Sequence, residues 1–317
     1  MVDSHGIPVT VISGFLGSGK TTLLNRLLQA DHGLQITVMV NDFGAIDIDS
    51  QLLESQDANS ISLKNGCICC SMQNDLVTEF QRLLAQPKRP EYILVETSGV
   101  SDPNKVVSTL RYPQLRDHFH LETVVTLLNA ETIADTDAAL KPLLMSQLDA
   151  ADLMVINKVD CVQQAQLDAI KQQWLYPAAR VLETSYADVP VELLFGVGNG
   201  VGNEVKPAWS FTPVNNNVDD HQTLFQSWSW TSGQPLNLQQ LRAVITQLPN
   251  HIYRVKGIFY TQEKAQQPLL LHMAGPRSEW QLLGVWTQAP ASQLVLIGAA
   301  NSLQPDELQD LFDACRC

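Results

Sequence analysis

The sequence has little cysteine and no long apolar run. Only 6 of its 317 residues are cysteine, which argues against the disulfide-stabilised folds of small secreted proteins. No stretch of about 18 uninterrupted apolar residues occurs, so we expect no membrane-spanning helix and no membrane partner. The opening residues, MVDSHGIPVTVISG, have an acid and no basic segment before a short apolar run. They predict a first strand and not a signal peptide, and the expected location is the cytoplasm.

Basic residues are also scarce. The chain has 20 Lys and Arg against 33 Asp and Glu, a formal net charge of -13. This balance argues against a nucleic-acid partner, because such proteins normally present a basic face. A nucleotide ligand is compatible with the charge, since a phosphate site needs only a few well-aimed donors.

Short apolar runs alternate with longer amphipathic segments over the first two hundred residues. Such runs, apolar on both faces and rich in β-branched residues, predict buried parallel strands; they occupy residues 9–13, 36–40, 92–96, 123–128 and 153–157. Helical patterns lie between them, most clearly at 21–30 and 75–86. The alternation predicts an α/β domain that is doubly wound around a mainly parallel sheet.

The pattern changes after Phe195. Residues 196–220 are rich in Gly and Asn without periodicity and predict a linker. We therefore expect one domain over residues 1–195 and a smaller α+β domain over residues 221–317. In the latter, strands are expected at 225–230, 252–260, 268–273 and 293–298, and helices at 235–248 and 305–315.

The segment GFLGSGKT at residues 14–21 fits the phosphate-loop pattern G-x-x-x-x-G-K-[ST], between a predicted strand and a predicted helix. Its glycines let backbone N–H groups turn towards a triphosphate. Lys20 can reach the β- and γ-phosphates, and the Thr21 hydroxyl can bind Mg²⁺. The expected phosphate-binding residues are Gly14, Gly17, Ser18, Gly19, Lys20, Thr21 and Thr22.

The segment NKVD at residues 157–160 ends a later predicted strand. The Asp160 carboxylate can accept hydrogen bonds from the two donors on the guanine edge, which adenine lacks. Asn157 can contact the base or brace the phosphate loop, and the stem of Lys158 can cover the base. Ser185, in ETSY, can complete the pocket through its backbone N–H.

The segment YILVETSG at residues 92–99 supplies the other side of the triphosphate. Glu96, at the end of the predicted strand, can hold Mg²⁺ through a water molecule. The Gly99 N–H can contact the γ-phosphate. We therefore expect Lys20, Thr21 and Glu96 to carry the catalytic chemistry.

Together, GFLGSGKTTLLN, NDFG (41–44), NGCICC (65–70), ETSG and NKVD resemble the motifs of the CobW-like family of P-loop GTPases. The resemblance covers essentially the whole chain. It implies GTP hydrolysis and a metallochaperone or cobalamin-related role, like that of urease- and hydrogenase-maturation GTPases. The chain departs from the family in two ways: Asp42 stands where the family usually has Glu, and the histidine-rich tract of many members is absent.

Three of the six cysteines, Cys67, Cys69 and Cys70, lie within four positions. Thiolates at this spacing suit Zn²⁺, or Co²⁺ or Ni²⁺. A redox pair and simple packing are the alternatives; only Lys64 is nearby to activate a thiol. A closed tetrahedral site needs four ligands, and only two or three are local here. The predicted metal site is therefore open, and a water molecule or a distant side chain would complete it.

The ligand that completes this site is left open by the sequence. Asp42 is either a metal ligand or a switch-loop acid near Mg²⁺. His118 and His120 are further candidates, although the simpler interpretation is that they are polar residues before a strand. We expect Cys161 to be a packing residue. Cys315 and Cys317 could bind metal, but the favoured interpretation is that they belong to a frayed, exposed terminus.

The predicted function is a GTPase that binds Zn²⁺ and delivers it to a client metalloprotein in a nucleotide-dependent way. No arginine or glutamine is placed clearly enough to act on the transition state, so slow intrinsic turnover is expected. One alternative is a nucleotide-gated binding module with incidental hydrolysis. A less favoured alternative is a small-molecule kinase that uses the same phosphate loop.

Overall fold

The computed structural model describes residues 6–30, 34–40, 59–62, 72–177, 179–195, 225–274, 277–286, 288–299 and 303–317. The chain divides into two compact units, Met1–Phe195 and Gly196–Cys317. Each unit is described by itself below. The predicted linker at 196–220 lies outside the described residues.

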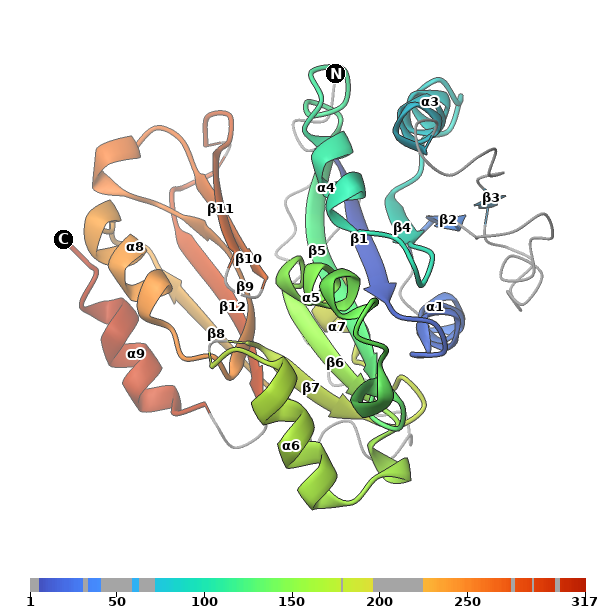
Figure 1. Ribbon diagram of the computed structural model, residues 1–317. Coiled ribbons are helices and arrows are strands. Elements are labelled where there is room, and N and C mark those ends of the chain that lie inside the picture. The colour runs from blue at the N-terminus through green and yellow to red at the C-terminus, as the bar shows by residue number, and fades with distance from the viewer. Residues whose placement is uncertain are drawn as a thin grey trace. The chain divides into compact units, whose positions relative to one another are not determined.

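The first unit is built on a seven-stranded sheet with the order β3-β2-β4-β1-β5-β6-β7, in which neighbouring strands are parallel (Figure 1). The strands are β1 (Ile7–Gly14), β2 (Ile36–Val40), β3 (Asn59–Ser62), β4 (Tyr92–Glu96), β5 (Phe119–Asn129), β6 (Leu153–Asn157) and β7 (Val181–Thr184). The central strands are almost wholly buried because helices cover both of their faces.

The helices of this unit are α1 (Lys20–Gln29), α3 (Met72–Leu84), α4 (Asn104–Leu110), α5 (Lys141–Asp149), α6 (Gln164–Trp174) and α7 (Val191–Leu194). On one face of the sheet, α3 and α4 pack against Val9 and Val11 of β1, and α5 and α6 pack against Met154 and Ile156 of β6. The carbonyl of Leu194 in α7 meets Thr10, which points to the other face. This arrangement confirms the predicted doubly wound α/β fold.

The second unit is an antiparallel five-stranded sheet with the order β11-β10-β9-β12-β8. Its elements are β8 (Phe225–Ser232), α8 (Leu238–Gln247), β9 (Ile252–Phe259), β10 (Leu269–Ala274), β11 (Arg277–Leu282), β12 (Ser292–Ala299) and α9 (Pro305–Asp313). Leu241 of α8 and Phe312 of α9 join a core with Trp230, Phe259 and Leu296 of the sheet. The predicted smaller α+β architecture is therefore confirmed.

The end of the chain corrects one prediction. Cys315 is buried in this core, and its carbonyl accepts a hydrogen bond from the Asn237 N–H at 2.8 Å. The Cys317 N–H donates to the Pro235 carbonyl at 3.0 Å. Residues 315–317 are thus tied to residues 235–237, and the prediction of a frayed terminus was wrong for Cys315; the Cys317 side chain is exposed as expected.

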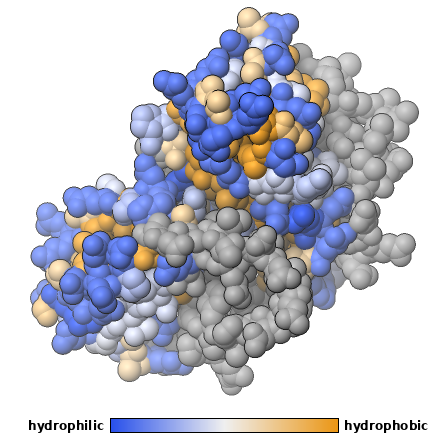
Figure 2. Space-filling view, turned by 90° about the horizontal axis from the view of Figure 1, so that it is seen from below, coloured by the Kyte–Doolittle hydropathy of each residue, from blue (hydrophilic) through white to orange (hydrophobic). Residues whose placement is uncertain are grey.

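Figure 2 shows one face of the molecule, where hydrophilic residues cover most of the coloured surface and apolar residues form smaller patches. Within the described ranges, the large hydrophobic side chains that stay exposed are Leu16, Met145, Tyr176, Tyr186, Leu282, Val285 and Leu311. The described helices include none with the length and apolar character needed to cross a membrane.

Candidate nucleotide site

A cavity of about 930 Å³ opens beside the carboxyl ends of β1, β4 and β6. In a parallel sheet these ends meet at one edge, which is where ligands of such folds bind. The cavity is lined by Leu16, Gly17, Gly19, Lys20, Thr21, Thr22, Glu96, Ser98, Gly99, Val100, Asn157, Lys158, Asp160, Cys161 and Tyr186. The structure therefore brings together most of the residues that the three sequence motifs singled out.

The loop between β1 and α1 depends on glycines at two tight points. Gly14 has φ of 137°, and a Cβ placed there would lie 2.3 Å from the Leu127 carbonyl oxygen. Gly19, directly before α1, has φ of 104°, and a Cβ there would lie 2.4 Å from Asn157 Nδ2. Only glycine fits both positions. Gly14 and Ser18, which were expected to bind phosphate, are not among the residues that line the cavity.

Lys20 and Thr21 are the first two residues of α1, and both line the cavity. The Lys20 side chain is largely buried, and its Nζ donates to the Phe15 carbonyl at 3.2 Å. The Thr21 hydroxyl donates to Glu96 Oε1, also at 3.2 Å. Glu96 ends β4 and is only 2% exposed. A hydroxyl beside a carboxylate is a hard-oxygen donor set of the kind that Mg²⁺ prefers, so these residues fit that ion.

The segment after β4 packs directly on the phosphate loop. A Cβ at Gly99 would lie 2.7 Å from the backbone nitrogen of Leu16. The side-chain amide of Gln147 in α5 holds the segment from behind, donating to the Gly99 carbonyl at 3.2 Å and the Ser101 carbonyl at 3.0 Å. The position of the Gly99 backbone is therefore tied to that of the phosphate loop.

The residues after β6 form the other end of the cavity. The Asp160 carboxylate accepts a hydrogen bond from the Ser185 side chain, which is the main reason that the pKa of Asp160 lies below its usual value; Lys158 lowers it further. Lys158 Nζ lies 3.6 Å from Glu131 Oε2. Ser185 is not among the cavity-lining residues and meets Asp160 through its side chain, a contact that the sequence did not predict.

Cys161 was predicted to be a packing residue, and this prediction was wrong. Its side chain is exposed, lines the cavity and lies 3.8 Å from Asp160 Oδ2. Desolvation and the neighbouring carboxylate raise the pKa of the thiol, which favours its neutral form. Sequence reasoning also missed Leu16, Ser98, Val100 and Tyr186 as cavity-lining residues.

Cys67, Cys69, Cys70 and Asp42 lie outside the described residues. Within the described part of the chain, no group of three or more His, Cys, Asp or Glu side chains is arranged to hold a metal ion. His118 is exposed and precedes β5, whereas His120 lies inside that strand.

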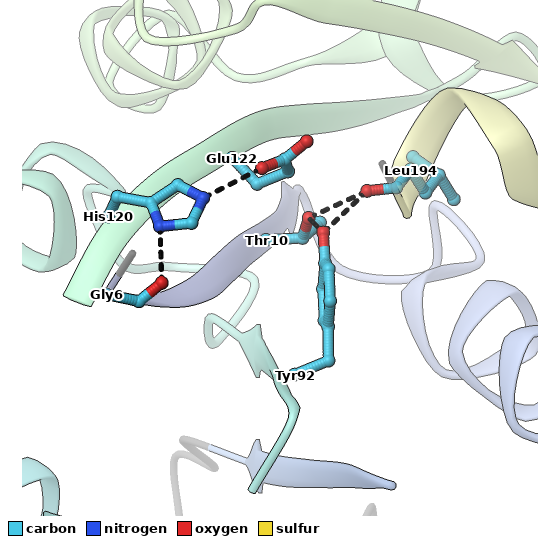
Figure 3. A network of polar contacts seen from close by, with 6 residues as sticks. All are labelled: Gly6, Thr10, Tyr92, His120, Glu122 and Leu194. Carbon is cyan, nitrogen blue, oxygen red and sulfur yellow. Dashed lines mark hydrogen bonds and ion pairs between the residues drawn. The ribbon is translucent and has the colours of Figure 1, made fainter. Parts of the chain in front are cut away.

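The imidazole of His120 lies between two acceptors (Figure 3). Nδ1 is 2.7 Å from the Gly6 carbonyl, and Nε2 is 3.0 Å from Glu122 Oε2. Tyr92 of β4 and Thr10 of β1 both donate to the Leu194 carbonyl, at 2.7 and 3.1 Å. His120 pairs with Pro8 near the start of β1, whereas Gly14 ends that strand beside the cavity. His120 therefore lies near the amino end of β1, whereas Thr21 and Glu96 lie at the carboxyl ends of β1 and β4.

Comparisons with known proteins agree with this geometry. Residues 8–180 match the model of the CobW/HypB/UreG nucleotide-binding domain, and residues 225–316 match the cobalamin synthesis protein cobW C-terminal domain. The zinc chaperone CobW of a Sinorhizobium species is 28% identical, over 92% of each chain. The zinc chaperone YjiA of Escherichia coli is 26% identical, over 98% of this chain and 99% of the relative.

A third relative matches over a smaller share of its own length. The zinc-regulated GTPase metalloprotein activator 1 of Dictyostelium discoideum is 30% identical, over 88% of this chain and 66% of the relative. The first family model spans more than half of the chain, and the second spans most of the smaller unit. The chain therefore belongs to the CobW-like family of P-loop GTPases.

Proposed function

We propose that the cavity binds GTP and GDP with Mg²⁺, and that the protein hydrolyses GTP to GDP and phosphate. The observation that carries the proposal is the convergence of Lys20, Thr21 and Glu96 with Asp160 on one cavity. Its volume of about 930 Å³ lies in the range of small-molecule and cofactor sites.

The phosphate end supplies the groups that hydrolysis needs. Lys20 would neutralise charge on the β- and γ-phosphates, and the Gly99 N–H would contact the γ-phosphate. Thr21 would bind Mg²⁺ directly and Glu96 through a water molecule. When bound, the ion offsets the charge that develops as water attacks the γ-phosphorus. Within the described residues no arginine or glutamine lines the cavity, which supports slow intrinsic turnover.

The other end of the cavity supplies base selection. The Asp160 carboxylate can accept from both donors of the guanine edge, and adenine would leave the same carboxylate without partners. Asp160 is ionised at neutral pH, and Ser185 and Lys158 favour this form further by lowering its pKa. This arrangement favours GTP over ATP and argues against an ATP-dependent kinase.

We further propose that the protein is a zinc carrier. Cys67, Cys69 and Cys70 would bind Zn²⁺, or Co²⁺ or Ni²⁺, as cargo, with Asp42 as a tentative further ligand. In the chain they lie between residues 41–44 and the Glu96–Gly99 segment, so GTP can govern their arrangement. The zinc-chaperone names of the relatives support this cargo. Delivery would be to a client metalloprotein in the cytoplasm.

Hydrolysis is tested with Lys20→Ala and with Lys105→Ala, an exposed lysine of α4, as the matched control. We expect Lys20→Ala to lower the GTP hydrolysis rate on the order of 100-fold and the control to leave it unchanged. A fully active Lys20→Ala variant, or competition by ATP as effective as that by unlabelled GTP, would contradict the proposal.

The proposed zinc binding and its coupling to the nucleotide are tested by measuring zinc affinity in the presence of a non-hydrolysable GTP analogue or of GDP. Tighter zinc binding with the analogue, abolished by Cys→Ser changes at 67, 69 and 70, is the expected result. Equal affinities in the two nucleotide states would rule out the coupling. Unchanged client activation by the Lys20→Ala variant would indicate a binding module in which hydrolysis is incidental.

A further inference from the structure

Backbone strain is concentrated at one end of the cavity. In the described part of the chain, the residues other than glycine with positive φ are Lys158, Tyr186 and Ala187. Lys158 directly follows β6, and the other two lie shortly after β7. Such conformations are unfavourable for these residue types and persist where the surroundings enforce them, often at ligand sites. Lys158 and Tyr186 both line the cavity.

Tyr186 and Ala187 are the central residues of a tight turn. The Asp188 N–H donates to the Ser185 carbonyl at 3.2 Å, and φ is 56° at Tyr186 and 54° at Ala187. Turns with two positive φ values normally carry Gly, Asn or Asp at these positions. The backbone conformation of this turn is therefore energetically unfavourable for Tyr186 and Ala187.

Three contacts hold the turn in this form. The Ala187 N–H donates to Asn157 Oδ1 at 2.8 Å. The Thr184 hydroxyl donates to the Asp188 carbonyl at 2.8 Å, and the Asp188 carboxylate pairs with Arg26 of α1. The turn is thus fixed to the strand end that carries NKVD and to the helix that follows the phosphate loop.

The turn buries one of two neighbouring side chains and exposes the other. Ala187 is fully buried, whereas Tyr186 is 71% exposed and lines the cavity beside Lys158 and Asp160. The contacts fix the backbone that carries the Tyr186 ring, and this exposed ring offers a flat apolar surface in the same cavity as Asp160. Purine rings stack on such surfaces.

We propose that Tyr186 is a base-stacking residue of the nucleotide site. This inference rests on the proposed function. It gives the two residues different roles: Asp160 selects guanine, and Tyr186 contributes affinity for the base of any bound nucleotide. Stacking tolerates different bases because every base has a π-face. The phosphate contacts are independent of the ring.

The test compares Tyr186→Ala and Tyr186→Phe with the native chain, using calorimetric titration with GDP·Mg²⁺. Tyr176→Ala is the matched control, since Tyr176 is a partly exposed tyrosine that does not line the cavity. Inorganic triphosphate serves as a probe without a base. We expect Tyr186→Ala to weaken GDP binding about tenfold. Tyr186→Phe and the control should bind GDP as the native chain does, and all four proteins should bind triphosphate equally.

A further variant, Tyr186→Gly, separates stacking from a structural role. Glycine relieves the positive φ but removes the ring, so the melting temperature should rise while GDP affinity falls. The inference is overturned if Tyr186→Ala binds GDP as tightly as the native chain, or if it loses GDP and triphosphate affinity equally. A native chain that binds triphosphate but not GDP would instead overturn the proposed function.

Discussion

The side-chain amide of Asn157 donates a hydrogen bond to the carbonyl oxygen of Ser18 at 2.8 Å, which joins the end of β6 to the phosphate loop. The same amide accepts from the Ala187 N–H through Oδ1. Both Asn157 and Ser18 are buried. One side chain therefore sets the distance between the phosphate-binding and base-binding ends of the cavity.

Replacing Asn157 with alanine should damage both stability and binding. The change leaves buried backbone groups of Ser18 and Ala187 without these partners, so we expect the free energy of unfolding to fall by about 2–4 kcal/mol. GDP affinity should fall at least about tenfold, because the two ends of the site lose their common anchor. Urea unfolding and GDP titration measure the two effects.

Asn104→Ala provides the control for this substitution. Asn104 is an exposed asparagine whose amide bonds locally to Asp102 at 3.0 Å. Its loss should change the unfolding free energy by less than about 0.5 kcal/mol. If Asn157→Ala behaved like Asn104→Ala in both measurements, the bridging role would be wrong.

The contact between Thr21 and Glu96 predicts a dependence of hydrolysis on Mg²⁺. Thr21→Ala should lower the maximal GTP hydrolysis rate on the order of 100-fold, whereas Thr21→Ser keeps the hydroxyl and most of the rate. Glu96→Gln keeps an oxygen that can accept from Thr21 but removes the charge, so half-maximal activity should need about ten times more Mg²⁺. The measurement is the rate as a function of Mg²⁺ concentration. Identical rates for Thr21→Ala and Thr21→Ser would exclude the hydroxyl as a ligand.

The role of Asp160 predicts a switch of base preference. Xanthine carries a carbonyl oxygen where guanine carries its exocyclic amine, so a side-chain amide can donate where the carboxylate accepted. Asp160→Asn should therefore weaken GDP binding by about 100-fold and strengthen binding of xanthosine diphosphate. Competition between the two diphosphates measures this change. A variant that lost affinity for both equally would show that Asp160 supports the loop and does not read the base.

Much of the fold was predictable because its central strands are short and buried on both faces. Residues 36–40, 92–96 and 153–157 were expected as strands and form β2, β4 and β6 with those bounds. The strands that were not predicted, β3, β7 and β11, all lie at sheet edges. An edge strand has one neighbour and more solvent exposure, so its sequence carries a weaker apolar signal. Asn59–Ser62, with three polar residues in four, illustrates this.

The site residues that belong to a sequence motif were predictable. The residues whose side chains enter the cavity because of the local turn conformation were not. The phosphate-loop and NKVD residues were singled out by their spacing together with their places at the ends of predicted strands. Tyr186 and Cys161 were not, because their exposure to the cavity depends on how residues 158–161 and 185–188 turn. Positive φ at Tyr186 and Ala187 cannot be read from residue types that usually avoid it.

The hydrogen bond from Ser185 to Asp160 gives the site a predictable response to pH. Because this bond lowers the pKa of Asp160, the carboxylate stays ionised as the pH falls and loses its charge only below the usual range for Asp. Only the ionised form accepts from both guanine donors, so native GDP affinity should persist at acidic pH and then decline.

Ser185→Ala removes the largest cause of the shift and should raise the pKa of Asp160 towards its ordinary value. The decline in GDP affinity should then begin at a higher pH than in the native chain, while affinity at neutral pH stays within about threefold. Titration of GDP affinity from pH 7 to about pH 3, below the ordinary pKa of Asp, measures both proteins, and Asp160→Asn is the control because it has no carboxylate to protonate at this position. The phosphates of GDP titrate equally in all three, so any difference between the curves reports on residue 160. Superimposable curves for the native chain and Ser185→Ala would mean that this hydrogen bond does not govern base recognition.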